Sequence, residues 1–376
     1  MTQSLLSFDT LPADPLDRVG FDIGWDHARH ALVPPAELML DGTPVSQGWL
    51  AGRAVFGRRS AVSTSRGVRQ WLALRLQAWR GGIDFDGLQV TPHHLVQIET
   101  SHCPVTRAAL GGATSGDDAP VITRLREDAG FAAGNLAVMS RAAARAKSGC
   151  SAAQALERAD RLQRSGHDSA STLDGLDAAA WARLATLMSL AVELPQVQAA
   201  RIALRALPPN RVRVLNPAQG LQVLLTLRLQ AAGWARRARA VADLLPRGEL
   251  RHDFNLFVGA LAARLMSVAD DVQGRELRWA QEDAWADGRV QRRWAQFIVQ
   301  MSMAESEALL QRLAEAGLAG VNGTRLLVHE ASAATEGWAL PTRGRVPAVP
   351  RRVPSGVHSG RGVPSSSNGS SLDLAA

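Results

Sequence analysis

The sequence predicts an α+β protein: a small hairpin-and-helix unit in an irregular N-terminal region, then a mostly α-helical domain and a disordered C-terminal tail. Three observations support this fold class. Turn signals and short apolar runs alternate between residues 99 and 150, helical periodicity dominates from residue 151, and from Pro341 the composition is mainly Pro, Ser, Gly, Val and Arg. The predicted divisions are 1–98, 99–150, 151–335 and 341–376.

The first 98 residues carry closely spaced turn signals, which predict short irregular segments. These signals are Asp14-Pro15, Pro34-Pro35, Asp41-Gly42 and Gly81-Gly82. Apolar residues recur at helical spacing from Val68 to Trp79. We therefore expect a helix over 68–79 in an otherwise irregular region.

Residues 99–150 predict a hairpin followed by a helix. A Cys-Pro-Val-Thr turn starts at Cys103, and a loop rich in glycine and aspartate follows it. The apolar pair Val121-Ile122 and the run 136–139 flank a turn at Gly130, and an alanine-rich segment comes next. Two short strands separated by a turn fit this pattern.

From residue 151 onward, apolar residues follow a helical period and strand signals nearly vanish. Helices are expected over about 197–207, 217–231, 233–245, 253–268, 274–286, 289–302 and 304–316. No constant repeat length links them, so a bundle is favoured over a solenoid. The tail has too few large apolar residues to offset the entropy of ordering.

Composition excludes several classes of protein. The net charge is +7, but five arginines and one aspartate in 341–376 supply +4 of it, so total charge is a poor argument for nucleic-acid binding. Two cysteines are too few for a disulfide framework and favour a cytoplasmic location. The first fifteen residues lack a basic segment, and the longest uncharged stretch, between Arg213 and Arg228, is short, so neither a signal peptide nor a membrane partner is expected.

The segment 102–147 contains the motif that suggests a biochemical function. It reads HCPVTRAALGGATSGDDAPVITRLREDAGFAAGNLAVMSRAAARAK and ends in the single lysine of the chain. Its order of Cys-x-x-Thr, a residue-Arg pair after two apolar residues, Gly-aromatic-x-x-x-Asn and a basic helix resembles the HNH, or ββα-metal, endonuclease motif. The whole chain, including FDIGWDHARHALVPP and WAQEDAWAD, also resembles a family of uncharacterised proteobacterial proteins in which the motif is better preserved.

This resemblance implies a unit that holds Mg²⁺ or Mn²⁺ beside a scissile phosphate. Asn135 matches the central Asn that braces the loop, and with Arg124 it is the candidate catalytic pair. Arg124, Arg145 and Lys147 are the candidate contacts to nucleic-acid phosphates. Thr123 stands where the motif has an acid and Ala144 where it has Asn or His, so the motif is degenerate and no metal ligand is assigned.

Other candidate sites are weaker. His27 and His30 could share a helix face, and His93-His94 form a pair, but neither set has a further ligand at metal-binding spacing. Cys103 and Cys150 lack redox spacing, and Gly111-Gly112 does not continue into a phosphate-binding loop. The tryptophans Trp234, Trp279, Trp285 and Trp294 are expected to fill the core instead of stacking on bases, and the second choice for a polyanion surface is Arg236, Arg237, Arg239, Arg292 and Arg293.

The favoured function is an HNH-like protein associated with DNA or RNA, with weak or lost nuclease activity. If it is active, it is a metal-dependent phosphodiesterase. The alternative is a helical protein-interaction or scaffold protein that retains the hairpin and helix only structurally, with its partner bound through the helical domain.

Overall fold

The computed structural model describes most of the chain. The described residues are 14–57, 64–111, 115–164, 171–229, 233–246, 248–267, 274–318, 320–321 and 324–325. They form fourteen α-helices, one short 3-10 helix and two pairs of antiparallel strands, so the fold is mostly helical with a small sheet. The predicted tail, 341–376, lies outside these residues.

The N-terminal region is more helical than the turn signals predicted. Its helices are α1 (Pro15–Arg29), η1 (Ala36–Leu38), α2 (Pro44–Phe56), α3 (Arg66–Arg80) and α4 (Pro92–Gln97). The helix expected over 68–79 is confirmed by α3. Elsewhere the region, which was expected to be irregular or helical, forms short helices, and Pro15, Pro44 and Pro92 each occupy the first turn of one of them. Proline is tolerated there since the N–H that it lacks would have no partner in the helix.

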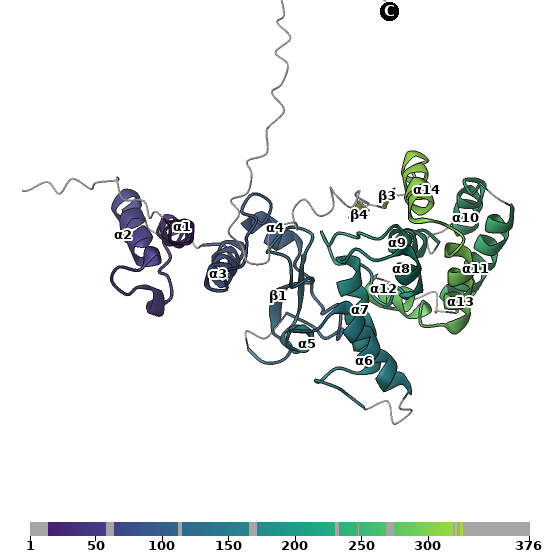
Figure 1. Cartoon of the computed structure of the whole chain (residues 1–376), viewed down its shortest axis with the longest axis horizontal. Helices are drawn as coiled ribbons and strands as arrows, with labels where there is room; N and C mark the ends of the chain where they lie inside the picture. The colour runs from purple at the N-terminus through teal and green to yellow at the C-terminus, as the bar shows by residue number, and fades with distance from the viewer. Residues whose placement is uncertain are drawn as a thin grey trace, which may run out of the picture. The chain divides into compact units, whose positions relative to one another are not determined.

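The predicted hairpin is present as β1 (Pro120–Arg124) and β2 (Leu136–Ser140), paired antiparallel with Thr123 opposite Ala137. All five residues of β2 are buried, whereas those of β1 are half-buried. Helix α5 (Arg141–Lys147) follows β2 directly and packs on both strands. Figure 1 shows α5 beside β1. We refer to β1, β2, α5 and the loop between the strands as the hairpin–helix segment.

The second half of the described chain is helical, as predicted. It contains α6 (Ala152–Arg164), α7 (Ala178–Leu190), α8 (Gln196–Arg201), α9 (Pro217–Leu229), α10 (Trp234–Asp243), α11 (Gly248–Met266), α12 (Gly274–Ala284), α13 (Gly288–Ile298) and α14 (Met303–Glu315). The short strands β3 (Gly320–Val321) and β4 (Thr324–Arg325) pair after α14. Only α8 is much shorter than the run that predicted it, 197–207.

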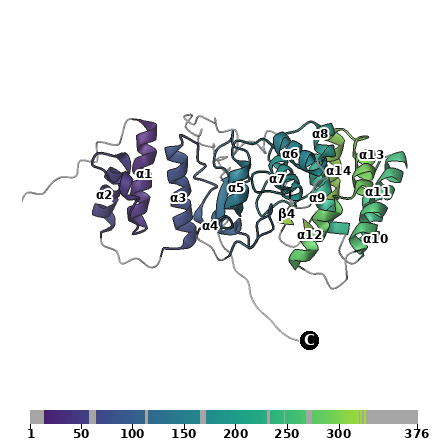
Figure 2. The ribbon, with the colours of Figure 1, turned by 90° about the horizontal axis from the view of Figure 1, so that it is seen from below.

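The buried apolar residues form three clusters. The first joins α3 and α4 to the hairpin–helix segment and to α6 and α7, so the two helices that follow residue 150 share the core of the hairpin. The second is built from α8 to α14, which lie together in Figure 2. The third is small and holds Ile23, Val45 and Leu76 of α1, α2 and α3. None of the described helices is both long and apolar enough to cross a membrane.

Candidate functional site

The Cys-x-x-Thr turn is anchored to the end of β2. The Sγ atom of Cys103 accepts hydrogen bonds from the N–H groups of Thr106, at 3.4 Å, and Ser140, at 3.3 Å. Ser140 in turn caps α5, because its Oγ accepts the N–H of Ala143. The Cys-x-x-Thr turn near the start of the motif therefore contacts the junction of β2 and α5 near its end.

Asn135 closes the loop between the two strands. Its Oδ1 accepts the N–H of Arg126 at 2.9 Å, and its Nδ2 donates to the carbonyl oxygens of Arg126 and Gly130, both at 3.1 Å. The side chain is 0% exposed, so water cannot replace these bonds. Gly134 precedes it at φ +92°, a conformation that favours glycine. The geometry makes Asn135 the brace of this loop.

Arg124 supports the same loop. Its Nη1 donates to the carbonyl oxygens of Glu127 and Ala129, both at 2.7 Å, and its guanidinium lies 5.1 Å from the centre of the Phe131 ring. Burial lowers the pKa of Arg124, while the charges of Glu127 and Asp128 act in the opposite direction. Arg124 is thus held inside the hairpin–helix segment by bonds to its own chain.

Lys147 is buried at the end of α5, with a side chain that is 1% exposed. Its Nζ donates to Oε1 of Glu127 at 2.5 Å, and Oε2 of Glu127 accepts the N–H of Gly149. Burial by itself raises the pKa of Glu127, but the bond and charge of Lys147 outweigh burial and hold that pKa below its usual value. A phosphate could reach Lys147 only if this pair opened.

Arg145 differs from the other predicted contacts because it is exposed. Its Nη2 donates to Oδ1 of Asp117 at 2.6 Å, and the two side chains are 65% and 69% exposed. Ion pairs between exposed groups are weak, since water and salt screen both charges. Arg145 can therefore exchange Asp117 for another anion at little cost.

The residues at the two positions where the resemblance implies metal ligands do not fit a divalent metal. The hydroxyl of Thr123 donates to the carbonyl oxygen of Arg124 at 3.4 Å, and Ala144 presents a methyl group that packs against the first core cluster. A neutral hydroxyl and a methyl group cannot supply the anionic or nitrogen ligands that Mg²⁺ or Mn²⁺ requires.

Three nearby acids and a nearby histidine are engaged by other side chains. Asp117 pairs with Arg145, Glu127 with Lys147 and Asp128 with both Nε and Nη2 of Arg126. His102 accepts a hydrogen bond from Arg275 instead, at 2.9 Å. Within the described residues, no group of three or more His, Cys, Asp or Glu side chains could hold a metal ion.

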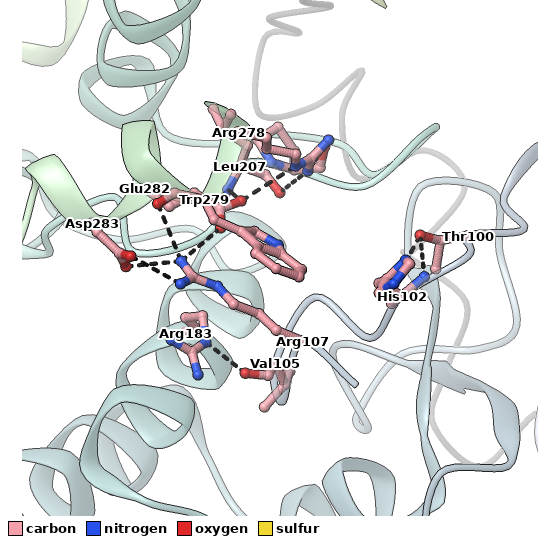
Figure 3. Close-up of polar contacts among 11 residues, drawn as sticks. Thr100, His102, Val105, Arg107, Arg183, Leu207, Arg278, Trp279, Glu282 and Asp283 are labelled. Atoms are coloured by element: carbon pink, nitrogen blue, oxygen red, sulfur yellow. Dashed lines mark hydrogen bonds and ion pairs between the residues drawn. The ribbon is translucent and has the colours of Figure 1, made fainter. Parts of the chain in front are cut away.

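A second polar centre, which the sequence did not indicate, lies between the Cys103–Leu110 turn and α12. Arg107, at φ +63°, donates to both oxygens of Asp283, at 2.8 and 2.9 Å, and to Glu282 at 3.3 Å. Its guanidinium also lies 5.3 Å from the Trp279 ring (Figure 3). The only signal for this centre was the Glu282-Asp283 pair in a predicted helix, and no pattern in the sequence links that pair to Arg107.

Two of the candidate histidines and two of the candidate tryptophans are buried. His94 is buried, and His27 is buried and bonds the carbonyl oxygen of Ile23. Trp285 and Trp294 are buried in the second core cluster, as expected for core tryptophans. Trp279 is half-buried and carries Arg107 and Arg275 on its ring.

Replacing Asn135 with alanine should destabilise the protein by about 3 kcal/mol, because three hydrogen bonds of about 1 kcal/mol each are lost from a buried loop. Urea unfolding measures this change. Asn255→Ala makes the same chemical change at an exposed position of α11 and should alter stability by less than about 0.5 kcal/mol. Equal effects of the two substitutions would contradict the bracing role.

Replacing Glu127 with glutamine should lower stability at neutral pH by about 1–3 kcal/mol, because Lys147 stays buried without its counter-charge. Since the folded-state pKa of Glu127 is depressed, its contribution is present above the ordinary pKa of glutamate, about 4.3, and is lost as pH falls through the folded-state value. Unfolding measured between neutral and acidic pH should show the difference from wild type shrinking. Glu157→Gln, at an exposed pair with Arg161, should show almost no difference at any pH.

The chain matches no protein-family model, no curated protein and no solved structure. What it does is therefore inferred from its own residues. The hairpin–helix segment offers a loop held rigid by Asn135 and Arg124, together with an exposed cation, Arg145. The centre at α12 offers a concentration of arginine side chains around two carboxylates.

Proposed function

We propose that the chain is an HNH-like protein associated with nucleic acid, and that its nuclease activity is weak or lost. The observation that carries this proposal is the three-bond clamp of Asn135 on the loop between β1 and β2. In the HNH motif that the segment resembles, the central Asn, between strand and helix, braces the loop. The order of hairpin, bracing Asn and basic helix supports the proposal.

Weak or lost cleavage is expected from the side chains that are present at the positions for a metal ion. Metal-assisted cleavage of a phosphodiester needs a cation that stabilises the leaving oxygen and a group that activates water. Thr123 and Ala144 do not fit such a cation. Three nearby acids are paired with arginine or lysine, namely Asp117, Glu127 and Asp128. The segment retains its internal bracing but lacks the ligands for chemistry.

Association with nucleic acid relies on Arg145 more than on the other predicted contacts. Lys147 and Arg124 are engaged by Glu127 and by loop carbonyls, whereas Arg145 is exposed and weakly paired. Arginine suits a backbone phosphate, because two of its N–H groups can bond two phosphate oxygens at once. We expect this contact to be insensitive to base sequence.

The second candidate function is a scaffold or interaction protein in which the hairpin–helix segment is only structural. The observation that favours it is that Arg124 and Lys147, two of the three predicted phosphate contacts, make their bonds inside the segment. In that case the helices α8 to α14 would carry the interaction.

A plasmid-nicking assay with Mg²⁺ or Mn²⁺ tests the chemistry. The wild-type chain should nick supercoiled DNA slowly or not at all. The double substitution Thr123→Asp plus Ala144→Asn restores a carboxylate and an amide at the two cation positions, and it should increase nicking by more than tenfold. The single substitutions are the controls, because one ligand alone should not bind the cation. A double variant that folds but does not cut would count against the HNH-like site.

Binding of a short DNA duplex, followed by fluorescence anisotropy at several salt concentrations, tests association. Arg145→Ala should weaken binding by about three- to tenfold and lower the slope of log affinity against log salt by about one. Arg161→Ala is the matched control, because Arg161 is 67% exposed and pairs with an acid, as Arg145 does. Binding that is independent of salt, or equal losses in both variants, would favour the scaffold function.

A further inference from the structure

A pocket of about 380 Å³ lies between the start of α11 and one side of α14. Its volume falls near the lower end of the range found for pockets that bind small molecules. Four apolar residues line it, together with four polar ones: Pro246, Leu250, Met301 and Ala308, then Glu305, Gln311, Arg312 and Glu315. The pocket therefore combines an apolar wall with charged side chains of both signs.

The apolar wall belongs to the core of the helical half. Leu250 and Met301 are 1% and 3% exposed and are members of the second core cluster. Pro246 and Ala308 extend this wall to the surface, where both are exposed. Apolar surface of this kind favours the hydrocarbon part of a ligand, because contact with it removes both surfaces from water.

Arg312 contributes an unpaired cation to the pocket. Its side chain is half-buried, its Nε atom is buried without a hydrogen-bond partner, and no described acid forms an ion pair with its guanidinium. A buried donor without an acceptor is unfavourable, because it has lost its bonds to water. Guanidinium groups bond carboxylates through two parallel N–H groups, so a carboxylate in the pocket would satisfy this donor.

Glu315 contributes an anion to the same pocket. It is exposed, it is the last residue of α14, and no described cation forms an ion pair with it, Arg312 included. Residues three apart on a helix are neighbours on its surface, so the two charges lie one turn apart without pairing. The carbonyl end of a helix carries a partial negative charge, which adds to that of Glu315 and favours a cation there.

The second acid of the pocket has a different role. Oε2 of Glu305 accepts hydrogen bonds from the N–H and the hydroxyl of Ser302, at 2.8 and 3.0 Å, and so caps the start of α14. Glu305 also lies two turns before Arg312. The pair of charges that a ligand would meet without displacing these hydrogen bonds is therefore Arg312 and Glu315.

We propose that this pocket binds a free α-amino acid with an apolar side chain. Its carboxylate would bond Arg312, its ammonium group would bond Glu315, and its side chain would pack on Leu250 and Met301. A simple carboxylic acid would be repelled by Glu315, and a simple amine would leave Arg312 without an acceptor. The pocket shares no residue with the hairpin–helix segment, so this site goes beyond the function proposed above and can fail independently of it.

Isothermal titration of the full chain with L-phenylalanine and with L-leucine tests the site. Saturable binding of at least one is expected. For phenylalanine, phenylpropanoate lacks the ammonium group and phenylethylamine lacks the carboxylate, and each should bind the wild type at least about tenfold more weakly because one charged group of the pocket is unmatched. Absence of saturable binding, or equal affinity for all three compounds, would overturn the proposal.

Two substitutions assign the charged groups of the ligand to residues. Arg312→Gln should weaken phenylalanine binding at least about tenfold and leave phenylethylamine binding unchanged, because only the carboxylate contact is removed. Glu315→Gln should weaken phenylalanine binding about threefold or more, since this carboxylate is exposed, and should strengthen phenylpropanoate binding.

The matched controls are Arg161→Gln on α6 and Glu307→Gln on α14, which lie outside the pocket and should leave all affinities unchanged. Melting followed by circular dichroism shows whether each variant is folded. A purely structural role of Arg312 or Glu315 would change the melting temperature without altering the preference among the three compounds, which would contradict the site. The comparison of compounds on the wild type needs no substitution, so the proposal can be refuted even if a variant does not fold.

Discussion

The hydrogen bonds of Asn135 are the constraint on which the hairpin–helix segment depends. The loop between β1 and β2 has backbone groups that the strand ladder cannot satisfy, and a single buried amide bonds three of them. With the loop fixed, Arg124 reaches the carbonyl oxygens of Glu127 and Ala129, and Glu127 reaches Lys147. The segment is therefore held together by its own polar contacts.

The residues that hold this loop in place differ from the residues that would bind a metal ion. In a site built around a cation, the ligands would be expected to contribute both to the fold and to the reaction. Here Thr123 and Ala144 stand where the resemblance implies metal ligands, while the basic residues Arg124 and Lys147 stabilise the loop. Arg145 is exposed at the surface of the segment, where it pairs only with the exposed Asp117.

Much of the fold could be predicted from hydrophobic periodicity, which is a local property. The helices α3 and α9 to α14 lie close to the runs that predicted them, because one apolar stripe per helix must be buried. The N-terminal helices were not predicted because proline occurs both in turns and in the first turn of helices. The residue before the proline distinguishes the two cases. Asp14, Thr43 and Thr91 each cap a helix through their side chains, a signal that could have been recognised.

The sequence by itself determined that a hairpin with Asn135 in its loop is followed by a basic helix. It also determined that Thr123 and Ala144 are not metal ligands. Both features depend on residue type and on spacing over a short stretch of chain. Only the tertiary structure decided which charged side chains are exposed and which are buried or paired. Lys147 is buried against Glu127, and Arg145 is exposed. Arg107 binds Asp283, which lies 176 residues away in the sequence. Burial and long-range pairing depend on how distant segments pack, and residue spacing along one chain carries no information about that packing.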